Sequence, residues 1–272
     1  MAAPIEGPYA MASPPPASLQ KFSPRAKASN IFAIASGKGG VGKTWFSITL
    51  THALTIAGRK SLLFDGDLGL ANLDIQLGLM PKYDLGAVIS GRMTLGQAVT
   101  AFGEGGFDVI AGRSGSGSLA NLAASRVQVL CDDLARLAGA YDAVVLDLGA
   151  GVDRTVRQLA HSAATCLVLA TDEPTSLTDA YAFIKMIHAE RPGGDIRIIV
   201  NVANSTKEGE KTYRTLLKAC EGFLKMSPPL LGIVRRDAKV REAIRSQKSL
   251  LTRYPNSEAA LDVEAIARRL LG

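Results

Sequence analysis

Cysteine is scarce in this chain, and the few cysteines present are poorly placed for pairing. The 272 residues include three, Cys131, Cys166 and Cys220, which lie far apart in the sequence. None belongs to a C-x-x-C pair, and an odd number cannot complete a disulfide framework. The sequence therefore indicates neither a disulfide-stapled fold nor a cysteine metal site, and we expect each thiol to be a small buried side chain.

Long apolar runs are also missing, although hydrophobic residues make up 47% of the chain. No run approaches the roughly 18–20 residues that a membrane-spanning helix requires. Residues 1–20 contain an early glutamate, no basic cluster and no apolar centre, unlike a secretory signal. We therefore expect a cytoplasmic protein, and the sequence leaves association with a membrane surface open.

Acidic residues do not balance the basic ones: the formal net charge is +6 and the isoelectric point is near 9.3. The excess is concentrated in residues 235–253, which hold seven Lys or Arg against Asp237 and Glu242. A solvated helix face explains such a stretch, and so does a surface for nucleic acid, an anionic membrane or a nucleotide. We favour the solvated face.

Hydrophobic patterning predicts one α/β domain over residues 30–272, preceded by a disordered Pro/Ala/Ser-rich arm at 1–29. Short apolar runs predict strands at 30–36, 61–65, 107–112, 141–147, 165–171, 195–201 and 229–234. Helices are predicted from residue 43 to Gly58 and at roughly 119–138, 153–162, 176–190, 208–224, 237–247 and 257–270, with a flexible loop at 112–118. The alternation predicts a mostly parallel central sheet with helices on both faces.

The first strand runs into the loop GKGGVGKT, which has the spacing G-x-x-x-x-G-K-T of a phosphate-binding loop. Backbone N–H groups of such a loop point at phosphate oxygens, and glycine allows that geometry. Lys43 is expected to reach the β- and γ-phosphates of ATP, and the Thr44 hydroxyl to bind Mg²⁺. The predicted ATP-binding residues of the loop are Gly37, Gly39, Gly40, Val41, Gly42, Lys43 and Thr44.

Carboxylates follow two further strands, where a nucleotide hydrolase needs them for its metal and its attacking water. Asp65 and Asp67 come just after the second predicted strand, and Asp147 ends a fully apolar strand in the manner of a Walker B aspartate. Ligands of parallel sheets bind beyond the carboxyl ends of the strands. The sequence thus predicts an ATP and Mg²⁺ site at this edge.

The loop has a second lysine, Lys38, and K-G-G-V-G-K-T resembles the deviant Walker A loop of the MinD/ParA family. The resemblance implies that Lys38 crosses an ATP-dependent homodimer to contact phosphate in the other subunit. It further implies that Asp67 positions the attacking water and that Asp65 and Asp147 hold Mg²⁺ through its waters. Gly149 would then lie near the γ-phosphate.

The same resemblance implies an adenine pocket at two later strand ends. Asn201 matches the asparagine that reads adenine, for which an amide with both donor and acceptor is suited. Arg235 stands beside this pocket, where the family usually has proline. We include both residues among the predicted ATP contacts.

Three longer segments resemble the FlhG/FleN branch of the family, which controls flagellar number and placement. They are DLGLANLDIQLGL at 67–79, TDEPTSLTDAYAFIK at 171–185 and NSEAALDVEAIARRLL at 256–271. The resemblance implies a slow ATPase switch whose partners are a flagellar transcription activator, flagellar switch-ring proteins or a signal-recognition-type GTPase. The arm at 1–29 lacks the helix by which some members stimulate that GTPase.

Two other functions, DNA partition and electron transfer, are alternatives to this interpretation. Binding of the last helix to a membrane is a separate alternative to its packing on the sheet. A ParA-type partition ATPase would bind DNA without sequence preference through residues 235–253. An electron-transferring reductase of the nitrogenase iron-protein type needs a cluster cysteine, and residues 148–160 contain none. The final helix has an apolar face that could bind lipid. We expect it to pack on the sheet instead, with no membrane segment beyond it.

Overall fold

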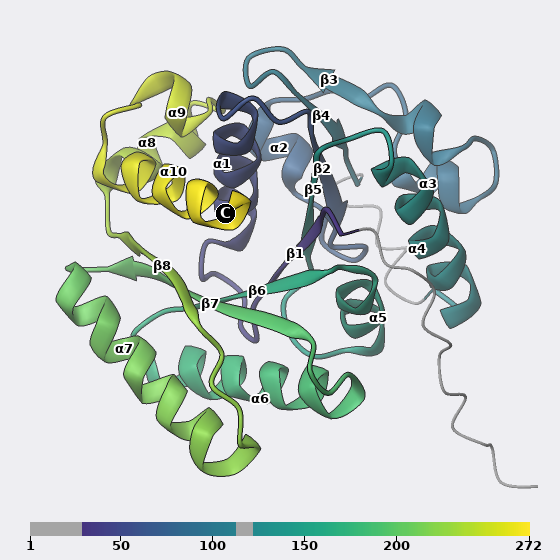
Figure 1. The fold of residues 1–272 in the computed structure, drawn as a ribbon. Helices are drawn as coiled ribbons and strands as arrows, with labels where there is room; N and C mark the ends of the chain where they lie inside the picture. Colours follow the sequence, from purple (N-terminus) through teal and green to yellow (C-terminus); the bar gives the residue numbers. More distant parts are fainter. Residues whose placement is uncertain (1–28, 113–121) are drawn as a thin grey trace, which may run out of the picture.

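A computed structural model describes residues 29–112 and 122–272 (Figure 1). The predicted disordered arm, apart from its last residue, lies outside the described residues. So do most of the predicted loop at 112–118 and the first residues of the helix predicted from 119.

Eight strands form one sheet, with the order β3-β4-β2-β5-β1-β6-β7-β8. Their bounds are β1 Ile31–Ala35, β2 Ser61–Gly66, β3 Thr100–Phe102, β4 Phe107–Ile110, β5 Ala143–Leu148, β6 Thr165–Ala170, β7 Asp195–Ala203 and β8 Leu230–Arg235. All neighbouring strands are parallel except β3 and β4. The predicted fold class is confirmed, and the short antiparallel edge strand β3 is an addition to it.

Helices cover both faces of this sheet (Figure 1). They are α1 Lys43–Ile56, α2 Leu73–Leu77, α3 Leu85–Ile89, the 3₁₀ helix η1 Leu95–Ala98, α4 Ala124–Ala138, α5 Arg154–Ser162, α6 Pro174–Glu190, α7 Thr206–Ala219, the π-helical turn η2 Cys220–Leu224, α8 Ala238–Arg245, α9 Leu250–Arg253 and α10 Glu258–Leu271. One hydrophobic core contains α4, α5 and α6, and the other contains α1 and α10. The predicted helix at 208–224 is α only as far as Ala219.

The central strands are apolar throughout because both of their faces are covered. All five residues of β1 are buried, and alternate side chains enter opposite cores. Ile31 and Ala33 face α4, α5 and α6, whereas Phe32 and Ile34 face α1 and α10. This is the pattern expected of parallel strands between two helical layers. It explains why the strand predictions needed no alternation of polar and apolar residues.

The last helix, α10, packs on the sheet, as predicted. Ala259, Val263, Ile266 and Ala267 are at most 1% exposed, and a Cβ added at Gly232 of β8 would overlap the Ile266 side chain. The apolar face is therefore occupied by the protein's own core, and its interpretation as a membrane face is wrong. Within the described ranges, no helix combines the length and the apolar character needed to cross a membrane.

The three cysteines have the role expected from their isolation. Cys131, Cys166 and Cys220 are free and buried, and burial raises the pKa of the Cys166 thiol to about 12. A thiol with such a pKa carries almost no thiolate at neutral pH. These residues act as small apolar side chains in the core.

Candidate nucleotide site

The candidate site lies where β1, β5 and β2 end at the same edge of the sheet. In the register of β2 with β5, Asp65 stands directly beside Asp147. The loop after β1 reaches the same edge, because β1 is the other neighbour of β5. Strand order therefore brings together the ends of three strands, at Ala35, Gly66 and Leu148, although more than a hundred residues separate the first from the last (Figure 1).

The phosphate-binding loop has the backbone geometry that the glycines were expected to supply. Gly40 and Gly42 have φ of 81° and 87°, which side chains with a Cβ rarely adopt. Gly42 is the N-cap of α1, and no side chain caps this helix end. The first N–H groups of α1 and its positive dipole end are therefore available for an anion, with Lys43 and Thr44 in the first turn.

Gly37 fixes the loop against α6. A Cβ added at this position would overlap the backbone carbonyl group of Asp179. Ser36 donates a hydrogen bond of 2.8 Å to the Lys38 carbonyl and shapes the start of the loop. The loop thus has little freedom to move away from α6.

Gly37→Ala is expected to displace the loop from α6 and to weaken nucleotide binding at least about tenfold, because the clash is with backbone. Calorimetric titration with ATP and Mg²⁺ measures this change. Gly103→Ala is the matched control, since a Cβ there meets nothing within 4 Å. Unchanged affinity for the Gly37 variant would show that the close packing on α6 does not shape the phosphate site.

Asp65 and Asp147 are both 1% exposed and stand side by side at the ends of β2 and β5. Ser47 donates to Asp147 Oδ1 over 2.9 Å, and Asp65 Oδ1 accepts from the Asp67 amide over 3.1 Å. Asp65 Oδ2 is buried, and no residue in the described ranges forms a hydrogen bond with it. Burial, and then the neighbouring Asp147, raise the pKa of Asp65 to about 8. Paired buried carboxylates with an unsatisfied oxygen fit a hydrated Mg²⁺ ion, which prefers such ligands.

Without a cation, Asp65 should make stability depend on pH. The unfolded chain releases this proton near the ordinary Asp pKa of 3.8, whereas the folded chain keeps it to about pH 8. Between these values the folded state binds more protons, so the free energy of unfolding falls as the pH rises. Asp65→Asn should therefore stabilise the nucleotide-free protein at pH 8 by on the order of a few kcal/mol.

Thermal melts of both proteins from pH 4 to pH 8, without Mg²⁺ or nucleotide, measure this effect. The difference between the two stabilities should shrink as the pH falls towards 4, because the folded chain already holds the Asp65 proton and the unfolded chain begins to bind it near its pKa of 3.8. An Asn variant that is less stable than wild type at pH 8 would contradict the assigned protonation.

Asp67 lies where the segment after β2 meets the segment after β5. Its Oδ1 accepts from the Leu70 amide over 2.9 Å, and a Cβ added at Gly149 would lie 3.4 Å from the same oxygen. The Gly151 amide in turn donates to the Ser36 carbonyl over 3.0 Å, which ties the segment after β5 to the phosphate loop. The structure therefore brings Asp67, Gly149 and the loop together, and their predicted roles towards water and the γ-phosphate stay predictions.

Asn201 contacts the loop directly. Its side-chain Nδ2 donates to the Val41 carbonyl over 2.7 Å, and the residue is 2% exposed. A Cβ added at Gly42 would lie 2.7 Å from the same nitrogen. Asn201 thus positions the loop, and its predicted contact with adenine stays a prediction.

Lys38 is bound to the start of α6 in its own subunit. Its Nζ lies 2.6 Å from Glu173 Oε2 and 2.9 Å from Thr175 Oγ1, at the start of α6. The Lys38 side chain is still 37% exposed. Lys38 favours the ionised form of Glu173 through this hydrogen bond, which lowers the pKa of Glu173. The lysine is held within its own subunit but remains at the surface.

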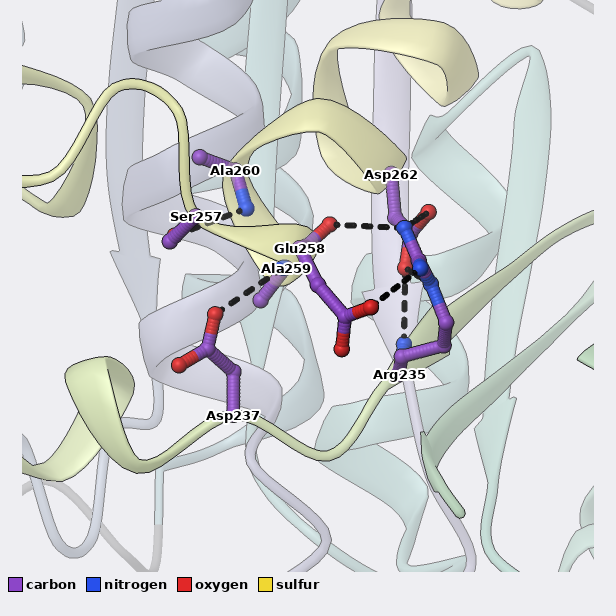
Figure 2. A network of polar contacts seen from close by, with 7 residues as sticks. All are labelled: Arg235, Asp237, Ser257, Glu258, Ala259, Ala260 and Asp262. Carbon is purple, nitrogen blue, oxygen red and sulfur yellow. Dashed lines mark hydrogen bonds and ion pairs between the residues drawn. The ribbon is translucent and has the colours of Figure 1, made fainter. Parts of the chain in front are cut away.

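Arg235 is bound by α10 (Figure 2). Its guanidinium group contacts Asp262 over 2.9 Å and Glu258 over 2.7 Å, and the Arg235 amide also donates to Asp262. Asp237 accepts from the Ala259 amide, so the same segment holds the first turn of α10. These contacts fix the end of β8 to α10, and the predicted ATP contact of Arg235 stays a prediction.

The rest of the basic stretch at 235–253 is partly compensated within the fold. Lys239 pairs with Glu242, and Lys248 pairs with Glu104 over 3.0 Å. These pairs are at the surface and contribute little to stability. They reduce the positive field of the stretch, in keeping with the solvated face that the sequence favoured.

Sequence reasoning did not identify Ser47, Glu173 and Thr175 as parts of the site. Ser47 lies one turn after Lys43 on α1, which places it on the same helix face. Glu173 and Thr175 belong to the segment 171–185 that was singled out for its resemblance to the FlhG/FleN branch. The resemblance of this segment to that branch is therefore the sequence feature that could have identified Glu173 and Thr175.

The fold and the loop together define a P-loop nucleotide-binding protein of the doubly covered parallel-sheet class. The family described as the CobQ/CobB/MinD/ParA nucleotide binding domain matches residues 32–251. The chain belongs to this family.

Curated relatives include regulators of flagella and of the division septum. The chain is 36% identical to the antiactivator FleN of Pseudomonas aeruginosa, over 88% of this chain and 85% of the relative. It is 29% identical to the flagellum site-determining protein YlxH of Helicobacter pylori, over 88% and 81% of the two chains. It is 31% identical to the septum site-determining protein MinD of Bacillus subtilis, over 88% of each.

Solved structures agree with the fold. The septum site-determining protein MinD of Pyrococcus horikoshii, complexed with Mg-ADP, superposes with a TM-score of 0.73 at 25% identity, over 89% of this chain and 95% of that one. The cell division ATPase MinD of Pyrococcus furiosus gives a TM-score of 0.73 at 23% identity, over 89% and 98%. The predicted MinD/ParA resemblance is thereby confirmed.

Proposed function

We propose that this chain is a Mg²⁺-dependent ATPase that dimerises on binding ATP and that controls flagellar number and placement. The observation that carries the proposal is the arrangement of Lys38. One lysine of the loop, Lys43, begins α1, whereas Lys38 stays at the surface on the start of α6. A second cation at the surface of a phosphate site is suited to contact the nucleotide of another subunit.

In the proposed mechanism, the residues of the loop bind and orient ATP. N–H groups from Gly39 to Thr44 bind the phosphates, and Lys43 neutralises the β- and γ-phosphate charge. Thr44, Asp65 and Asp147 would hold Mg²⁺, which when bound spreads the charge that develops on the phosphate oxygens.

Asp67 orients the attacking water, and Lys38 of the partner stabilises the developing charge. Hydrolysis is expected to be slow, because its function here is to end the dimeric state rather than to supply a product. The bound nucleotide thus selects between the monomer and the dimer.

Lys43→Ala should weaken ATP binding by about a hundredfold, equivalent to about 2.7 kcal/mol, because the phosphates lose their main partner in the same subunit. Calorimetry with ATP and Mg²⁺ measures the affinity. Lys211→Ala is the matched control, since Lys211 is an exposed lysine of α7. Unchanged affinity of the Lys43 variant would contradict the P-loop assignment itself.

The flagellar assignment rests on the similarity to FleN and YlxH and on the segment 171–185. The proposed partners are a flagellar transcription activator and switch-ring proteins or a signal-recognition-type GTPase, and the proposed location is the cytoplasm at the cell pole. Counting flagella in cells that lack the gene, and in cells complemented with wild type or Lys43→Ala, tests this assignment. Flagellar numbers that do not change in the deletion would contradict it.

The alternative of a DNA-partition ATPase is not favoured. It depends on the basic stretch, of which Arg235, Lys239 and Lys248 are already paired with carboxylates. DNA affinity that falls steeply with salt concentration would support the alternative.

A further inference from the structure

An open apolar groove lies on the outer face of α4, apart from the residues assigned to ATP. It is formed between α4 and the segment that contains α3 and η1, and its volume is about 730 Å³. Its apolar lining includes Val88, Ile89, Met93, Val129, Leu130 and Leu137. Val129 is 59% exposed, which is unusual for a branched apolar side chain beside a hollow. The groove therefore has the character of a docking surface for an apolar segment.

The charged residues of the groove already have partners in its walls. Asp133 and Arg136 form an ion pair with each other, one turn apart on α4. The Arg126 guanidinium group donates to the Ile89 carbonyl over 2.8 Å and joins the two walls. The Asp133–Arg136 pair is neutral as a whole, whereas Arg126 keeps its single positive charge. Most of the remaining lining is apolar, so the occupant must be recognised mainly by apolar contact.

Asn30, the residue directly before β1, lies at one end of this groove. The Asn30 side chain donates hydrogen bonds of 2.8 Å to the carbonyl groups of Ala138 and Tyr141. Ala138 is the last residue of α4 and directly follows Leu137, which lines the groove. The residues that precede Asn30 are therefore tethered beside the groove.

The tethered segment has both the length and the apolar side chains to fill it. The sequence 14–22, PPPASLQKF, contains Leu19 and Phe22 after three prolines. An extended chain covers roughly 3.3 Å per residue, so Phe22 can reach about 23 Å from residue 29, and Leu19 further. The 15 residues of α4 span about 22 Å. Phe22 and Leu19 can thus reach any part of the groove.

We propose that residues 14–22 of the same chain occupy this groove, with Leu19 and Phe22 as apolar anchors. The prolines favour an extended conformation before docking, which reduces the entropy lost on binding. The tether at Asn30 keeps the segment at a high effective concentration. This docking does not depend on the proposed ATPase cycle.

The test measures how far the arm covers the groove in the whole protein. Val129→Cys places one reactive thiol in the groove, because the three native cysteines are buried. Deleting residues 1–28, or changing Leu19 and Phe22 to Ser together, should raise its labelling rate at least about fivefold. A synthetic peptide of residues 10–28 should slow labelling of the deleted protein again.

Two controls separate docking from a general change in the protein. Changing Ile5 and Tyr9 to Ser removes similar apolar side chains outside the proposed anchors and should leave the rate unchanged. Leu261→Cys, at an exposed position on α10, should label equally with and without the arm. An equal rate at residue 129 in the full-length and Ser-substituted proteins would overturn the proposal. Protection that grows with protein concentration would also overturn it, because the occupant would then be a second copy.

Discussion

Lys38→Ala is expected to abolish the ATP-dependent dimer while ATP still binds to each subunit. Lys43, Thr44 and the N–H groups of the loop do not depend on Lys38, so ATP affinity should fall only several-fold. Each interface, however, loses a cation that would face the partner's phosphates in a poorly hydrated place. The dimer should weaken by at least about a thousandfold, equivalent to about 4 kcal/mol.

Glu173→Gln is the matched control for this substitution. It removes the carboxylate that lies 2.6 Å from Lys38 but keeps the lysine itself. Because the lysine then loses a charged partner in its own subunit, the dimer should form at least as readily as in wild type. A Glu173 variant that fails to dimerise would show that this contact belongs to the dimer rather than to the monomer.

Asp67→Ala is expected to lower ATP turnover by about a thousandfold and to trap the ATP-bound dimer. The residue lies beside Gly149 and outside the phosphate loop, so the change leaves the binding groups in place. Single-turnover measurements with excess enzyme report hydrolysis, and sedimentation reports the dimer. Turnover equal to wild type would show that Asp67 does not position the water.

Asp67→Asn distinguishes chemistry from local folding. Asp67 Oδ1 accepts the Leu70 amide, and an Asn side chain can keep that hydrogen bond. If Asp67 acts through its charge on the water, both variants should be inactive. If the Asn variant were fully active and the Ala variant inactive, Asp67 would act only by accepting the hydrogen bond from the Leu70 amide.

The sequence predicted the parts of the site but not their spatial order. The loop at 37–44 and the strand-end aspartates were recognised from their patterns. They lie close together because β5 pairs with both β1 and β2. This pairing joins strands that are far apart in the sequence, so the local pattern of residues does not reveal it. The prediction that Asp65 and Asp147 act together therefore came from the family resemblance and the general rule for sheet edges.

Short elements were the ones that could not be predicted. β3 has three residues, Thr100–Phe102, and is fixed by pairing with β4 rather than by its own hydrophobic pattern. The helices α2, α3 and α9 have at most five residues, too few for a helical period to be read. Likewise, the in-subunit contact of Lys38 with Glu173 joins residues 135 positions apart.

A mixture of Lys38→Ala and Asp67→Ala tests whether the lysine acts across the interface. In a mixed dimer, the Lys38→Ala subunit keeps its own Asp67 and receives an intact Lys38 from its partner. That one site should regain activity, although each variant alone is inactive. No recovery in a mixture that still forms mixed dimers would place the action of Lys38 within its own subunit.

Equilibrium sedimentation of the wild-type protein and Lys38→Ala, each with ADP and with ATP, tests the central claim most directly. The account predicts a monomer with ADP for both proteins, a dimer with ATP for wild type, and a monomer with ATP for the variant. A full ATP-dependent dimer of Lys38→Ala would contradict it, since the second lysine of the loop would then be only a surface charge.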